Sequence, residues 1–180
     1  MSKIMVCSLG ILVGIAYSAC AMKKMSPERV SEGTELINAA RAGHVDNLSM
    51  LLEKGVSVDS RDSDGRTALM IAVSYGHVDS VRILLNEKAN ADVQDNSGDT
   101  ALILATLTGQ EDMVKLLLDK DANVDLQNNA GDTALILAAR DGYADIVSML
   151  IGNKLDVNVR DKCGRTALIN AARIGHVAIV

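Results

Sequence analysis

The chain has 180 residues and a formal net charge of −5, and it contains no Trp, no Phe and three Tyr. An acidic chain without a basic stripe is a poor match for nucleic acid, because a phosphate backbone requires concentrated Lys and Arg. With so few rings, the core must consist of Leu, Ile, Val, Met and Ala, which favours thin layers of closely packed helices. The length allows one domain, with or without a targeting segment.

The first two dozen residues follow the order of a secretory signal peptide. A short basic start at residues 1–3 precedes an almost wholly apolar run, and small residues at 18–21 precede Lys23 and Lys24. The apolar run is short for a bilayer span of about 20 residues. We assign residues 1–21 to a signal peptide or membrane anchor and residues 22–31 to a short tether. The expected location is extracytoplasmic: membrane-anchored, periplasmic or secreted.

Ser18-Ala19-Cys20 resembles the end of a bacterial lipobox, whose cysteine is lipidated and becomes the N-terminus. This resemblance implies lipidation of Cys20, a membrane tether and a bacterial source. Tyr17 departs from the pattern, where that family has Leu or another aliphatic residue. Other readings stay open: a plain secreted protein cleaved at an A-x-A site before Met22, an uncleaved anchor, and a cytosolic protein with an apolar head.

From Glu32 onward the sequence repeats with a period of 33 residues. The copies occupy residues 32–64, 65–97, 98–130, 131–163 and 164–180, the last incomplete. A period in this range is typical of a solenoid. The recurring positions include Thr34, Thr67, Thr100, Thr133 and Thr166; Leu36, Leu69, Leu102, Leu135 and Leu168; and Gly43, Gly76, Gly109, Gly142 and Gly175.

Each copy predicts a pair of helices. In the second copy a glycine turn precedes Thr67, which can cap a helix running from about Ala68 to Tyr75. Gly76 suits the left-handed end of that helix, and a second helix is expected from Val78 to about Asn86. Such a pair cannot bury its apolar face alone, so neighbouring copies must stack.

This unit resembles the ankyrin repeat, on the evidence of Gly-Asp-Thr-Ala-Leu-Ile-Leu-Ala-Ala from Gly131, Gly76-His77-Val78-Asp79 and Asp121-Ala-Asn-Val-Asp125. The resemblance implies an all-α solenoid of stacked helix pairs with β-hairpin-like loops, of about five repeats. Two departures are expected to change stability and not fold. The family's Pro is replaced by Ala68, Ala101, Ala134 and Ala167, and its His by Met70, Ile103, Ile136 and Ile169.

The two ends of the stack are expected to differ from its middle. Asn38 and Asn170 take the position of Ile71 in a central copy, and a polar Asn38 suits the outer face of a solubilising first repeat. The last residue, Val180, aligns with the middle of a second helix. We therefore expect a truncated chain with a poorly held final repeat and an exposed apolar end.

The sequence shows no constellation for catalysis, and we expect no cofactor, no metal and no small-molecule substrate. His44, His77 and His176 share one repeat position, which separates His44 from His77 by a helix layer of about 8–10 Å. Zinc–nitrogen bonds are about 2 Å long, so these histidines are interpreted as structural. Asp62 and Asp64 hint at a calcium-binding loop, but that loop would need an acid or amide at Ser60 and a glutamate at Ile71. Cys163 is a lone thiol without a neighbouring base.

The ankyrin resemblance implies that a protein partner contacts the hairpin tips and the concave ends of the first helices. We expect Tyr75, Leu107 and Arg140 to form a strip at the interface centre, since Tyr and Arg are favoured in hot spots. Asp99 and Asp132 on successive tips hint at a basic partner segment. The full predicted set is Asp64, Arg66, Tyr75, Asp99, Leu107, Thr108, Asp132, Arg140, Asp141 and Arg165.

The function predicted from these features is a non-catalytic scaffold that is exported, membrane-tethered and monomeric, and that binds a protein partner through a concave surface. Two alternatives stay open. One is a regulatory subunit that binds and modulates an enzyme, and the other is a secreted effector that acts on host proteins.

Overall fold

A computed structural model describes residues 27–153 and 155–180. The predictions for the signal peptide, for Cys20 and for residues 22–26 of the tether therefore lie outside the described residues. The helices are α2 (Pro27–Ala42), α3 (Val45–Glu53), α4 (Ala68–Ser74), α5 (Val78–Asn86), α6 (Ala101–Leu107), α7 (Glu111–Leu118), α8 (Ala134–Asp141), α9 (Ala144–Ile151) and α10 (Ala167–Ile174). Within this part of the chain, no helix is both long and apolar enough to cross a bilayer.

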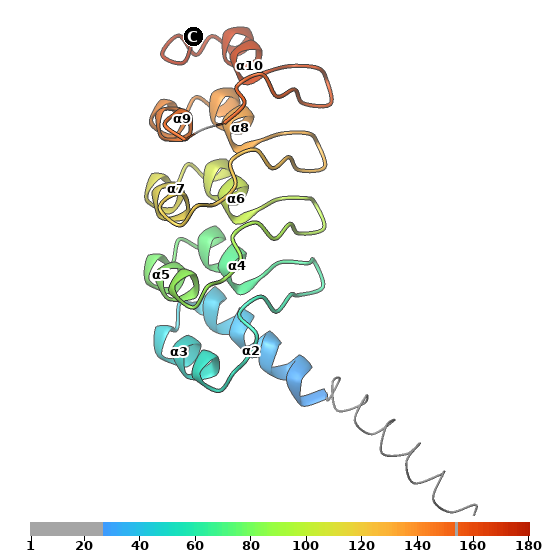
Figure 1. Cartoon of the computed structure of the whole chain (residues 1–180), viewed down its shortest axis with the longest axis vertical. Coiled ribbons are helices and arrows are strands. Elements are labelled where there is room, and N and C mark those ends of the chain that lie inside the picture. Colours follow the sequence, from blue (N-terminus) through green and yellow to red (C-terminus); the bar gives the residue numbers. More distant parts are fainter. Residues whose placement is uncertain (1–26, 154) are drawn as a thin grey trace, which may run out of the picture.

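The helices form two columns, with a row of loops projecting from one side (Figure 1). The inner column consists of α2, α4, α6, α8 and α10, and each of these helices contacts the next. The outer column consists of α3, α5, α7 and α9, which also pack in succession. The described residues form no extended strand, apart from an isolated antiparallel bridge between Arg61 and Thr67. The predicted all-α solenoid is confirmed.

A threonine starts every inner helix from α4 onward, as predicted. The hydroxyl oxygen of Thr67 accepts a hydrogen bond from the Met70 amide at 3.4 Å, and Thr100 accepts from the Ile103 amide at 3.2 Å. Such caps satisfy amides that have no partner within the first turn. Gly76 follows α4 with a φ of +73°, a conformation that glycine adopts at little cost. The helix ends at Ser74, slightly earlier than expected.

The first repeat begins differently from the others. Helix α2 starts at Pro27, inside the segment predicted to be a tether, and Thr34 lies within the helix and does not cap it. The period alone therefore misplaces this helix start.

The residues that replace the ankyrin histidine become part of the core in the central repeats. Met70, Ile103 and Ile136 are all buried, as are the recurring alanines Ala72 and Ala105 between the layers. Fully burying an aliphatic side chain of this size contributes about 1.5–3 kcal/mol. At the last layer, the equivalent Ile169 is exposed.

The two terminal asparagines have different environments. Asn38 is exposed on the outer face of the first repeat and accepts a hydrogen bond from Arg41 Nη1 at 3.0 Å, which suits a polar cap. Asn170 is buried, its Nδ2 donates to Asp161 Oδ2 at 3.4 Å, and its Oδ1 has no partner. The expected apolar end is present, with Leu168 and Val180 exposed beside α10.

Candidate functional site

Backbone hydrogen bonds join the loops between repeats into a regular row. The Asn96 amide donates to Asp64 O at 2.9 Å, and the Asn129 amide donates to Ser97 O at 2.9 Å. The Lys162 amide continues the series to Ala130 O at 3.2 Å. The loops therefore hold each other at a set spacing, and a partner that binds them need not order each loop separately.

Hydrogen bonds from the side chains of Gln94 and Gln127 also join the loops of this row. Gln94 Nε2 donates to Gly98 O in its own loop at 2.8 Å and to Gln127 O in the next repeat at 2.9 Å. Gln127 repeats this arrangement toward Gly131 O and Arg160 O, at 2.6 and 3.0 Å. Each glutamine side chain thus links its own loop to the next one, which adds to the rigidity of the surface.

The aspartate that opens three of the four loops, at Asp62, Asp95 and Asp161, is a turn former. Asp62 Oδ1 accepts from the amides of Asp64 and Arg66, both at 2.9 Å. Burial raises the pKa of Asp62, but the hydrogen bonds and the charge of Arg66 outweigh it, so the net pKa is lowered. The carboxylate is thus engaged in the turn. Among the described residues, no group of three metal-binding side chains forms.

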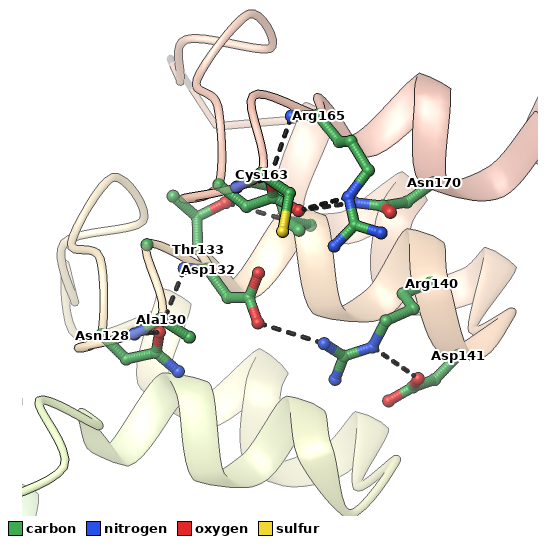
Figure 2. Close-up of polar contacts among 12 residues, drawn as sticks. Asn128, Ala130, Asp132, Thr133, Arg140, Asp141, Cys163, Arg165 and Asn170 are labelled. Carbon is green, nitrogen blue, oxygen red and sulfur yellow. Dashed lines mark hydrogen bonds and ion pairs between the residues drawn. The ribbon is translucent and has the colours of Figure 1, made fainter. Parts of the chain in front are cut away.

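The predicted tip residues fall into charge pairs, with one exception. Arg66 pairs with Asp62 and Asp64 at 3.0 and 2.7 Å. Arg165 pairs with Asp161 at 3.0 Å. Asp132 pairs with Arg140 at 3.1 Å (Figure 2). Among the described residues, no cationic side chain forms an ion pair with Asp99.

Asp99 and Asp132 differ in what they present to a partner. Asp132 is only 8% exposed and its charge faces Arg140, so it adds little negative charge to the surface. Asp99 is half-buried and accepts a hydrogen bond from Asn128 Nδ2 at 2.9 Å. Burial raises the pKa of Asp99, the hydrogen bond from Asn128 lowers it, and the nearby charges of Asp95 and Asp132 raise it, so the net pKa is raised. The acidic character suggested for this surface therefore resides mainly at Asp99.

The strip residues lie at the C-terminal ends of α4, α6 and α8, three inner helices that contact in succession. Tyr75 is 58% exposed and its ring stacks on His77, with centroids 6.2 Å apart. Leu107 ends α6 and is 36% exposed. Arg140 bonds Asp132 on one side and Asp141 on the other, both at 3.1 Å (Figure 2).

Thr108 lies in the repeat position of Tyr75 and Asp141, but its side chain forms a hydrogen bond with its own helix. Its hydroxyl donates to Leu104 O at 2.9 Å and accepts from Gln110 Nε2 at 2.7 Å. It therefore has less hydrogen-bonding capacity left for a partner than its exposure suggests.

His77 and His176 each connect one layer of the stack to the preceding one. His77 Nε2 lies 3.0 Å from Arg41 O, and His176 Nε2 lies 3.0 Å from Arg140 O. Both carbonyls are at the ends of inner helices, where no backbone partner is available.

The Cys163 side chain is exposed, while its backbone amide donates to Asp161 Oδ1 at 2.8 Å.

Sequence reasoning missed Asn128, which orients Asp99. A signal was present, because Asn128 occupies the repeat position of Asp62, Asp95 and Asp161. An amide can donate a hydrogen bond to a neighbouring carboxylate, which an ionised aspartate cannot.

The fold and this surface define a helical repeat solenoid with a row of rigid loops. A family model of ankyrin repeats (3 copies) matches residues 12–95, 36–128 and 84–161. The chain belongs to the ankyrin-repeat family. Ankyrin repeats generally mediate protein–protein binding and are generally non-catalytic. A comparison with curated proteins found no match.

Proposed function

We propose that this chain is a scaffold that binds a protein partner through the loop tips and the exposed strip of Tyr75, Leu107 and Arg140. The observation that carries the proposal is that the strip lies beside a row of loops already held in register by hydrogen bonds between repeats. Binding then proceeds by complementarity to a rigid surface, with no cofactor and no turnover.

The strip combines features that favour binding. Tyr75 exposes a ring that a partner can cover, and Tyr loses little conformational entropy on binding. Arg140 is already oriented by two carboxylates, so fewer rotamers are lost when a partner packs against it. Leu107 adds apolar area between them.

Site-specific photocrosslinking in the native cell tests this proposal. A photoreactive residue at Ser74, in the repeat position of Leu107, is expected to yield one dominant protein adduct. The same residue at Arg82, exposed on the outer helix α5, is the matched control. Tyr75→Ala should abolish the Ser74 adduct, whereas Met50→Ala, which removes an exposed side chain on α3, should not. Equal adducts from both positions would contradict a strip-centred interface.

We also propose that the scaffold is exported and tethered to a membrane through lipid on Cys20. The support is the order of basic, apolar and small residues before Cys20, which is that of an exported lipoprotein. The intact mass of the mature protein from the membrane fraction tests this, and a chain beginning at diacylated Cys20 is expected. A lipid-free chain beginning at Met22 would contradict the tether, and an uncut chain would contradict the processing of this segment.

A further inference from the structure

One repeat contains an ion pair that its neighbour lacks. Arg140, near the end of α8, donates from Nη1 to Asp132 Oδ2 on the loop tip eight residues earlier, at 3.1 Å. One period back, the same two positions hold Leu107 and Asp99. Both helices begin at a threonine N-cap, and both loops accept an equivalent backbone hydrogen bond from the next loop. Asp99 therefore has the place of a paired carboxylate, but leucine stands where the arginine would be.

The surroundings of Asp99 favour a cation from outside the chain. Its carboxylate is half-buried and is oriented by Asn128, while Asp95 and Asp132 are the nearby acids. The adjoining layers carry Arg66 and Arg140, and carboxylates of their own repeats already bind both: Asp62 and Asp64 bind Arg66, and Asp132 and Asp141 bind Arg140. A partly buried carboxylate without an opposite charge is unfavourable, and a partner that supplies the charge removes this cost.

We propose that Asp99 receives an arginine side chain of the protein partner, whose aliphatic part lies over Leu107 and whose guanidinium pairs with the Asp99 carboxylate. The contact reproduces between two proteins the pair that Arg140 and Asp132 make within this one. Arginine fits better than lysine, since its planar fork can bond the carboxylate oxygens while its stem covers apolar surface. The inference rests on the proposed binding function and specifies the partner's chemistry at one position.

Selection from a random-sequence peptide library displayed on phage, with the full chain immobilised, tests the inference. The selected peptides are expected to share an arginine beside apolar residues. Asp99→Asn keeps the shape of the side chain, and it should weaken the binding of these peptides about tenfold, as expected for loss of a hydrogen bond to a charged group. Asp112→Asn is the matched control, because Asp112 is an exposed acid on the outer helix α7. It should leave binding unchanged.

Leu107→Arg provides a second test, and its NMR readout does not depend on the library. The new guanidinium should pair with Asp99 within the chain, as Arg140 does with Asp132. The pKa of Asp99, followed by NMR of its carboxyl carbon, should then fall, and arginine-containing peptides should no longer be selected. An unchanged pKa would show that the two positions are not equivalent and would overturn the inference.

The outcomes separate this inference from the proposed function. Peptides that require Tyr75 and Leu107 but carry no common arginine would overturn the inference alone. Arginine peptides that bind the Asp99→Asn variant as tightly as the wild type would do the same, and so would an empty selection. Peptides whose binding is insensitive to Tyr75→Ala and to Leu107→Ala would contradict the proposed function itself.

Discussion

Helices α6 and α10 begin with the same three residues and have opposite environments. Leu102 in α6 is 1% exposed, whereas the equivalent Leu168 in α10 is 55% exposed. Both helices start at a threonine cap of the same geometry, with hydrogen bonds of 3.2 and 3.3 Å. The start of a helix is thus a property of its own repeat, whereas burial depends on the next layer in the stack.

The largest expected difference between these regions comes from leucine truncation. Leu102→Ala should lower the free energy of unfolding by about 2–5 kcal/mol, because it leaves a cavity between packed layers. Leu168→Ala should cost less than about 1 kcal/mol, since the side chain is largely in solvent already. Urea unfolding of the full chain, followed by circular dichroism, measures both values. Equal losses would mean that α10 is covered in solution.

Glycine substitution at the loop tips tests whether the hydrogen-bonded row extends through the whole stack. Gly98 and Gly164 have φ angles of +79° and +76°, so alanine should cost about 1–2 kcal/mol at either position. A Cβ on Gly98 would also lie 2.7 Å from the Asn129 amide nitrogen, whereas none of the surrounding atoms lies within 4 Å of one on Gly164. Gly98→Ala should therefore lower the melting temperature clearly more than Gly164→Ala. A larger loss from Gly164→Ala would argue against the hydrogen-bonded row.

The helix caps should show no difference between the regions. Thr100→Val and Thr166→Val each remove the hydroxyl oxygen that accepts from the third helical residue, while keeping the side-chain volume. Each should cost about 1 kcal/mol, because this interaction is local. Amide hydrogen exchange at Ile103 and Ile169 reports each cap separately. A much larger effect at Thr100 would show that the cap bond depends on burial.

The smallest expected effect is on the pH dependence of the free energy of unfolding, to which Asp161 and Asp99 should contribute with opposite signs. The backbone amide of Arg165 is the main cause that lowers the pKa of Asp161, so its ionised form stabilises the fold. This contribution is present above the unfolded pKa of about 3.9 and is lost as the pH falls through the lower folded value. Asp161→Asn should thus be less stable than the wild type at pH 7, and the difference should shrink in acid.

Asp99 provides the opposite case. Burial raises the pKa of Asp99, so stability is lost as the pH rises through the interval between the unfolded and folded values. Asp99→Asn should therefore be at least as stable as the wild type at pH 7, and the free energies of unfolding of the two proteins should converge in acid. Stability curves of both variants from pH 3 to pH 7 make the comparison, and parallel curves would contradict the assigned signs.

Within the second repeat, the sequence alone was sufficient to predict the helix pair and its caps. The threonine caps, the glycine ends and the span of α5 were all predictable, because each depends on residues a few positions apart. The extent of α2 was not, because Glu32 stands where the second repeat has the turn glycine Gly65, and the helix runs through Thr34.

The sequence by itself determined the repeat, the helix pair and the family, because these follow from a short pattern repeated in register. The tertiary structure alone showed that Asp132 is neutralised by Arg140 and that Asn170 is buried. It also showed that no cation of residues 27–153 and 155–180 pairs with Asp99. The charge and burial of these side chains depend on which groups the stacking brings within about 4 Å of them. A repeating pattern places equivalent residues alike along the chain, but their neighbours differ from one layer to the next.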